Sequence, residues 1–192
     1  MIERALGLAT TLRAGALAAV LVFAQAPAPA QDGQRPAPDQ AWLARVSHVV
    51  DGDSIWVRPS GGGARRRLRL DGIDAPEICQ PLGPEARGAL QALTLSQPVR
   101  VTVHAYDRWG RGIATVHRVS DGLDLGATLV AQGWAWAEGY RGRPWAKARY
   151  APQEAEARRH RRGVFAGVPE GVSPETPADF RRRHGPCVPT RR

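Results

Sequence analysis

The chain has 192 residues, a formal net charge of +9 and a sequence pI near 11.0. This length allows one domain with a substantial hydrophobic core and leaves little room for two. Arginine carries nearly all of the positive charge, because Lys147 is the only lysine. A genomic bias toward Arg explains that choice as well as a preference for phosphate oxygens does. The excess charge itself favours a polyanionic partner such as nucleic acid.

The first 30 residues predict an export signal. Arginines in the leading segment precede a short apolar run at 14–24, which is too short to span a bilayer comfortably. Small-residue cleavage patterns end at Ala26 and at Ala30, and we favour Ala30 because a proline follows Ala26 directly. Retention as an uncleaved anchor is the alternative. We expect an exported protein, periplasmic or secreted, without stable membrane insertion after cleavage.

The remaining chain divides into three parts. Residues 31–40 are polar and Pro-rich, as in a linker, and residues 41–167 carry the periodic patterns of a folded domain. Residues 168–192 contain five prolines and an Arg run with little apolar periodicity, so we expect an irregular tail.

Within the domain the pattern changes from strands to helices. Strands are predicted at 46–50, 54–58, 65–70, 99–103 and 112–119, and helices at 84–95, 125–132 and 152–162. Pro84 suits a first helical position, and Gly133 is a natural helix stop. Five short strands with one helix between the third and fourth predict an α+β fold, a five-stranded OB-type Greek-key β-barrel with three helices. A sandwich fits less well, because helices interrupt the strands too soon.

Three acidic residues follow the ends of predicted strands at Gly or Pro turns: Asp53, Asp74 and Glu77. Carboxylates at strand ends can converge on one point, and hard oxygen ligands suit calcium or magnesium. The five histidines show no metal-ligand spacing. Taken singly, each aspartate is more often a turn former that hydrogen-bonds its own backbone. The chemical signal therefore comes from their combination.

Two arginines accompany these acids. Arg69 lies on the strand that leads to Asp74, and Arg111 lies in a tight turn between two later strands. Each alone is more often a surface residue. Together with a metal, two guanidinium groups can stabilise the charge that grows on a phosphodiester in its pentacoordinate state.

Three motifs in this order resemble the staphylococcal nuclease (thermonuclease) family. They are Val-Asp-Gly-Asp-Ser at 50–54, Arg-Leu-Asp-Gly-Ile-Asp-Ala-Pro-Glu at 69–77 and Asp-Arg-Trp-Gly-Arg-Gly at 107–112. The resemblance covers about 45–167, nearly the whole expected domain. It implies the same OB-type barrel.

The resemblance also implies a site and an activity. Calcium would be held by Asp53, Asp74 and the backbone carbonyl of Ala75, while Glu77 acts on the attacking water and Arg69 and Arg111 stabilise the phosphate. The implied activity is an endonuclease that hydrolyses DNA and RNA and leaves 3′-phosphates. We expect a monomer.

Base recognition departs from the family pattern. The tyrosines that line the prototype's nucleotide pocket fall near positions 139 and 141, which are Gly and Arg here. Base stacking would then come from Trp109, Trp136 or Tyr140, with Arg108 as a further substrate contact.

The two cysteines, Cys79 and Cys187, suggest a disulfide, because distant pairs in oxidising compartments are more often bridged than free. Such a bond would hold the tail beside Glu77 and bring the arginines at 181–183 toward the phosphate groove. A mobile tail with free thiols is the alternative.

A second class of function is a non-catalytic nucleic-acid-binding OB module. Three acids at one locus would repel a polyanion unless a cation lay among them, so a simple binding module would be expected to lose them. This chain keeps all three together with both arginines, which favours the enzyme. A cell-surface role is supported by the export segment alone.

Overall fold

The computed structural model describes residues 35–94, 97–139, 146–168 and 174–187. The expected export signal at 1–30 lies outside the described residues. Among the helices of the described ranges, none has both the length and the apolarity needed to cross a membrane.

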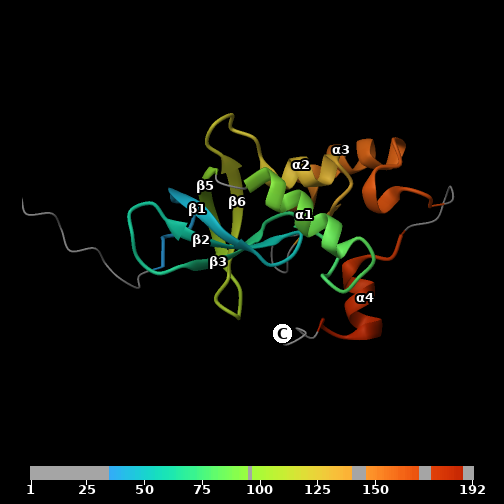
Figure 1. Ribbon diagram of the computed structural model, residues 1–192, viewed down its shortest axis with the longest axis horizontal. Helices are drawn as coiled ribbons and strands as arrows, with labels where there is room; N and C mark the ends of the chain where they lie inside the picture. The colour runs from blue at the N-terminus through green and yellow to red at the C-terminus, as the bar shows by residue number, and fades with distance from the viewer. Residues whose placement is uncertain (1–34, 95–96, 140–145, 169–173, 188–192) are drawn as a thin grey trace, which may run out of the picture.

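Five strands form a closed barrel, shown on the left of Figure 1. They are β1 (Ala41–Val49), β2 (Ser54–Pro59), β3 (Arg66–Leu70), β5 (Pro98–Tyr106) and β6 (Gly112–Arg118), joined in the order β1-β2-β3-β6-β5. Neighbouring strands are antiparallel except β3 and β6, and β1 pairs with both β2 and β5 to close the barrel. The predicted OB-type barrel is confirmed. β1 begins five residues earlier than expected, because 41–45 pair with β5.

Alternate residues fill the barrel interior, as the period of two in a strand requires. The side chains that meet there are Ile55, Val57, Leu68, Leu70, Val99, Val101 and Val103. Because Leu68 and Leu70 point inward, Arg69 between them points to the opposite face of β3. The alternation of the strand thus places Arg69 on the outer face of β3, beside the cleft described below.

Three helices pack together beside the barrel: α1 (Gly83–Thr94), α2 (Leu125–Ala131) and α3 (Ala146–Arg159) (Figure 1). The side chain of Asp124 caps α2 by accepting a hydrogen bond from the Ala127 N–H. A single turn of 3₁₀ helix, η1 (Gly163–Phe165), follows α3.

Helix α3 begins earlier than expected. It starts at Ala146, so Pro152 lies inside the helix rather than at its first position. A proline there removes one backbone hydrogen bond. Ala146 and Tyr150 are buried in the preceding turns, and this packing extends the helix despite that cost.

A short ribbon connects the barrel to the helices. β4 (Ile73–Asp74) pairs with β7 (Trp136–Ala137), and Asp74 lies opposite Trp136. Gly72 precedes β4 with a φ of +83°, and a Cβ there would lie 2.9 Å from the Ala146 carbonyl oxygen. Glycine is therefore required where the chain enters the loop that carries Asp74.

The expectation of an irregular tail was wrong for its central part, because residues Pro177–His184 form helix α4. Thr176 caps this helix by accepting a hydrogen bond from the Asp179 N–H, and Pro177 occupies the first turn. Thr176 and Pro177 therefore favour the start of a helix here. The helix was not predicted, because it is too short to show apolar periodicity. A disulfide between Cys79 and Cys187 joins the end of the tail to the loop before α1, with the two Cα atoms 5.7 Å apart.

Candidate active site

A cleft of about 990 Å³ opens beside the barrel, between β3, the β5–β6 turn and α4. Its lining includes seven of the residues predicted from the sequence: Asp53, Arg69, Asp74, Glu77, Arg108, Trp109 and Arg111. Ala178 and Arg181 of α4 also line the cleft. The tail is therefore a structural part of the cleft.

Asp53 and Asp74 converge at the centre of the cleft. The Nη2 atom of Arg69 lies 2.7 Å from Oδ1 of Asp74 and 3.3 Å from Oδ2 of Asp53. The Ala75 N–H donates to Oδ2 of Asp53 over 3.2 Å, which ties the two turns together. Gly52 permits this approach, because a Cβ there would lie only 2.6 Å from the Ala75 Cβ.

Arg69 makes the burial of these two carboxylates possible. Asp53 and Asp74 are only 6% and 4% exposed, and burial raises the pKa of Asp74. Burial works to lower the pKa of Arg69, but the charges of Asp53 and Asp74 outweigh it and raise the pKa. The Nη1 atom of Arg69 also donates to the carbonyl oxygens of Ile73 and Leu70, over 2.9 and 3.3 Å. Arg69 is thus a permanently charged, fixed component of the site.

A further carboxylate, Asp51, was not predicted from the sequence. Its Oδ1 accepts a hydrogen bond from the Asp53 N–H over 3.0 Å. Burial and the charge of Asp53 raise the pKa of Asp51 from 3.8 to about 7. Asp51 therefore carries a proton part of the time near neutral pH. Its position in an Asp-Gly-Asp turn was the available signal in the sequence, but an aspartate at such a position is equally typical of a residue that only stabilises the turn.

The β5–β6 turn holds Arg111 in the cleft. Oδ2 of Asp107 accepts a hydrogen bond from Nε of Arg111 over 2.6 Å, and Oδ1 accepts from the N–H groups of Arg111 and Trp109. Burial works to raise the pKa of Asp107, but these hydrogen bonds hold it below the ordinary value. Sequence reasoning missed this supporting role of Asp107, although an Asp four residues before an Arg was the signal.

The predicted stacking residues have different positions. Trp109 is 62% exposed beside the cleft, with the Arg108 guanidinium carbon 4.2 Å from its ring centroid. Trp136 is only 5% exposed and packs edge-on against Phe165, with ring centroids 5.9 Å apart. Its assignment as a base-stacking residue was wrong, because β7 turns this side chain into a small second core. Tyr140 lies outside the described residues.

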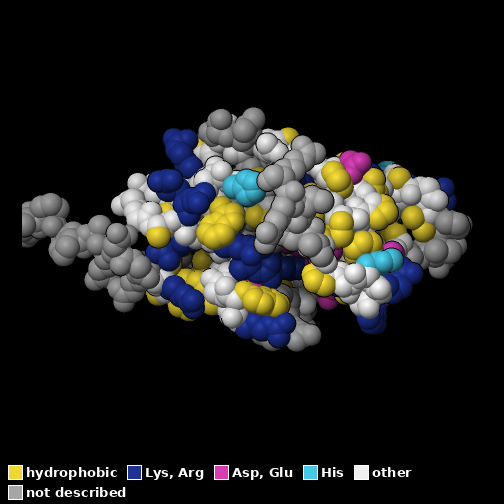
Figure 2. Space-filling view, turned by 60° about the horizontal axis from the view of Figure 1, so that its bottom comes forward, with side chains coloured by type: hydrophobic (Ala, Val, Ile, Leu, Met, Phe, Trp, Pro, Cys, Tyr) yellow, Lys and Arg dark blue, Asp and Glu magenta, His cyan; other side chains and the backbone are white. Residues whose placement is uncertain are grey.

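A second hollow, of about 320 Å³, continues the cleft over the barrel surface. It shares Arg67, Tyr106 and Trp109 with the cleft. Its other lining residues include Arg35, Trp42, Trp56, Arg65 and Arg66. In Figure 2, dark blue Arg side chains and yellow apolar side chains lie next to one another over the barrel half. Such a mixture of guanidinium groups and aromatic rings is typical of surfaces that bind single-stranded nucleic acid.

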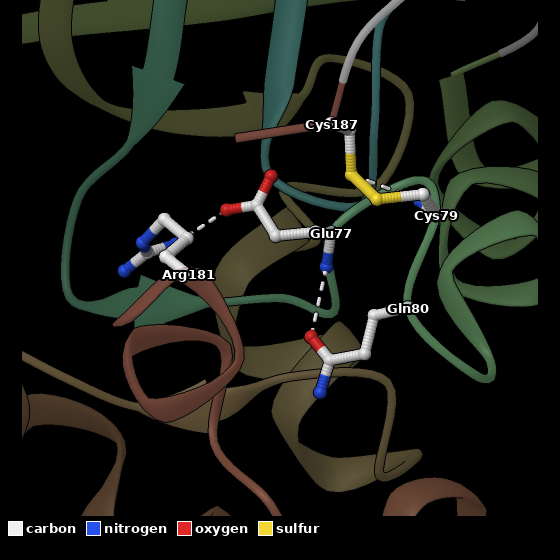
Figure 3. Close-up of a disulfide and its surroundings, with 5 residues drawn as sticks. All are labelled: Glu77, Cys79, Gln80, Arg181 and Cys187. Atoms are coloured by element: carbon white, nitrogen blue, oxygen red, sulfur yellow. Dashed lines mark hydrogen bonds and ion pairs between the residues drawn. A yellow bond between two sulfur atoms is a disulfide. The ribbon is translucent and has the colours of Figure 1, made fainter. Parts of the chain in front are cut away.

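Glu77 contacts the tail helix. Its Oε1 accepts a hydrogen bond from Nη1 of Arg181 over 2.5 Å, and its own N–H donates to Oε1 of Gln80 over 3.2 Å (Figure 3). Of the three tail arginines expected near the groove, Arg181 reaches the acids. Arg182 and Arg183 pair instead with Asp179 and Glu175.

The donor set at the centre of the cleft suits a hard divalent cation. Within the described ranges, no three or more His, Cys, Asp or Glu side chains cluster closely enough to form a metal site by themselves. Asp53 and Asp74 nevertheless converge on one nitrogen of Arg69, so their oxygens can also converge on one cation. Two such carboxylates supply part of a coordination shell, which further protein, water and substrate oxygens can complete.

Comparisons with known proteins identify the family of this chain. The family described as "Staphylococcal nuclease homologue" matches residues 67–166, so the chain belongs to this family. It is 37% identical over 128 residues to "Micrococcal nuclease" of Shigella flexneri, covering 63% of this chain and 72% of that protein. It is 35% identical over 173 residues to "Protein ParB" of Escherichia coli, covering 85% and 88%. It is also 34% identical over 123 residues to an "Uncharacterized endonuclease" of Escherichia coli, covering 64% and 76%.

Proposed function

We propose that this protein is a calcium-dependent endonuclease that hydrolyses phosphodiester bonds in DNA and RNA. The observation that carries the proposal is the convergence of Asp53 and Asp74 on Arg69, inside an arginine-rich cleft. Buried acids weaken the binding of a polyanion unless a cation lies among them. The names of two of the relatives compared above, a nuclease and an endonuclease, support the same class of reaction.

Asp53, Asp74 and the carbonyl of Ala75 would hold the calcium ion. When bound, calcium supplies Lewis-acid polarisation of a phosphoryl oxygen. Arg69 pairs with both carboxylates and holds them directed at the same point. Asp53 and Asp74 therefore offer negative charge at the proposed cation site, and the positive charge of Arg69 reduces their repulsion of the phosphate.

Glu77 and Arg111 would act on the reacting groups. Glu77 is the cleft carboxylate assigned to accept a proton from, or orient, the attacking water. Arg111, fixed by Asp107, offers its remaining N–H groups to the oxygens that gain charge in the pentacoordinate state. Water attacks phosphorus, the bond from phosphorus to the 5′ oxygen breaks, and the products are a 3′-phosphate and a 5′-hydroxyl.

The continuous hollow beside the cleft would bind the substrate strand. Bases can stack on Trp109, and phosphates can contact the arginines at 65–67. A Cys79–Cys187 disulfide is stable in oxidising compartments, which supports the proposed export of the protein. We propose that the exported protein acts as a monomer.

Cleavage by the purified protein tests the proposal against its rival. Wild-type protein and Glu77→Gln are incubated with supercoiled plasmid and with RNA in calcium, and binding is measured in parallel. We expect the wild type to cut both and the variant to bind both with strongly reduced cutting. Tight binding by the wild type with no cutting of either would support the non-catalytic binding module instead.

A further inference from the structure

The tail helix α4 places a guanidinium group on the two acids assigned to metal binding and water activation. Nη2 of Arg181 lies 3.0 Å from Oδ2 of Asp74. Nη1 of Arg181 lies 2.5 Å from Oε1 of Glu77, a contact that is drawn in Figure 3. Nη1 also lies 3.4 Å from Oδ1 of Asp74. One side chain from the end of the sequence therefore bridges both groups.

These contacts use oxygens that a cation would need. Oδ1 of Asp74 accepts a hydrogen bond from Arg69 over 2.7 Å, and Oδ2 accepts from Arg181. Arg69 is buried and built into β3, whereas the side chain of Arg181 is 40% exposed on the cleft wall. Burial works to lower the pKa of Arg181, but Asp74 and Glu77 outweigh it and raise the pKa. Arg181 is therefore always charged and is the partner of Asp74 that can move aside.

The tail cannot carry Arg181 far from the acids. Cys79, two residues after Glu77, is bonded to Cys187, which lies six residues after Arg181. Gln80 donates to the carbonyl of Glu175 over 3.0 Å at the other end of the tail segment. Both ends of α4 are thus attached to the loop that holds Glu77, which keeps the local concentration of the guanidinium high.

We propose that Arg181 is a tethered counter-ion of the active site, which competes with the divalent cation for Asp74 while it also pairs with Glu77. Oδ1 of Asp74 is already held by Arg69, so a cation would use Oδ2, where the like charge of the Arg181 guanidinium repels it. Binding of the cation therefore requires Arg181 to move away. The tail thereby sets the cation concentration at which the site becomes active. The inference rests on the proposed function for the identity of the competing cation.

Calcium-binding calorimetry without substrate tests the competition. Arg181→Gln removes the competing charge, and Arg182→Gln is the matched control, because Arg182 lies on the same helix but pairs with Asp179. We expect Arg181→Gln to bind calcium about tenfold more tightly than the wild type, within the ~5- to 150-fold range of coupled sites. Arg182→Gln should keep the wild-type affinity. Arg181→Lys, which keeps the charge and the helix, should lie between the two.

A second variant tests the role of the Cys79–Cys187 disulfide, which attaches the tail to the loop of Glu77. Cys79→Ser/Cys187→Ser releases the tail but keeps Arg181, so calcium affinity should rise in the same direction. Thermal melts without metal check that each variant is folded.

If the wild type binds calcium and Arg181→Gln binds it no more tightly than the wild type does, the inference is overturned but the proposed function is not. Absence of calcium binding in every protein, together with absence of cleavage, would overturn the proposed function and the inference with it.

Discussion

The side chain of Asp107 fixes the direction of Arg111: its Oδ2 accepts a hydrogen bond from Nε over 2.6 Å, within the same β5–β6 turn. The carboxylate of Asp107 is fully buried, while the guanidinium lines the cleft. The turn therefore presents Arg111 in one orientation before any substrate binds. A hydrogen-bond donor that is already oriented, such as Arg111, needs no reorganisation when negative charge develops on the phosphate.

Changing either member of this pair should slow cleavage. Arg111→Lys should lower kcat by about 10²–10³-fold, the effect of losing one preset donor, because a point charge cannot replace a two-pronged contact. Asp107→Asn should lower kcat by up to about 10²-fold through misorientation alone. Single-turnover cleavage at saturating substrate measures both. Asp121→Asn, which disrupts a surface Arg–Asp pair with Arg118, is the control. A fully active Arg111→Lys would remove this residue from the catalytic set.

Glu77→Gln should affect turnover far more than binding. The amide keeps the shape of the side chain but cannot accept a proton, and general acid–base contributions are typically about 10²–10⁴-fold. Titration of substrate gives KM and kcat separately. If kcat stayed at the wild-type value and KM alone rose, Glu77 would be a substrate-binding residue.

The barrel and the main site residues could be predicted, because their signals are local. Alternating residues such as Leu68, Arg69 and Leu70 define β3 and the face on which its arginine lies. The aspartates at strand ends and the motif at 69–77 located the acids, and the resemblance supplied their roles. The two cysteines suggested that the tail lies beside Glu77, but the sequence could not give the individual side-chain contacts between distant segments.

Two cases illustrate that limit. Arg181 reaches Asp74 across 107 residues, through a helix too short to show a period. Trp134 and Trp136 alternate in one short segment, so the pattern did not reveal which face of β7 is buried. Burial of Trp136 depends on Phe165, which follows α3 and was not predicted to lie nearby.

The positions of two tryptophans give opposite predictions. Trp109→Ala should weaken substrate binding by about 1–3 kcal/mol, or about 5- to 150-fold in KM, because base stacking on an exposed ring is lost. Trp136→Phe should leave KM unchanged, since its ring packs against Phe165 away from the cleft. Steady-state kinetics on one oligonucleotide compare the two. A rise in KM for Trp136→Phe with none for Trp109→Ala would reverse these assignments.

The disulfide should contribute to stability as well as to the position of α4. It joins residues separated by 108 positions, and bonds that close loops typically stabilise a protein by about 2–4 kcal/mol. Cys79→Ser/Cys187→Ser should lower the free energy of unfolding by that amount in urea denaturation. Thiol titration of the denatured, unreduced protein should detect no free thiol. Two thiols per chain would show that the cysteines are not bridged.

The most direct test of the central claim is a calcium add-back experiment on nucleic-acid cleavage. The purified protein is treated with a chelator, assayed on plasmid, and assayed again after calcium is restored in excess. Asp53→Ala and Asp74→Ala are assayed in parallel, with circular dichroism to verify that both are folded. Cleavage should stop in chelator, return with calcium, and be absent in both variants, because these two carboxylates converge where we propose that the cation binds. Full cleavage in excess chelator would contradict a metal-dependent nuclease.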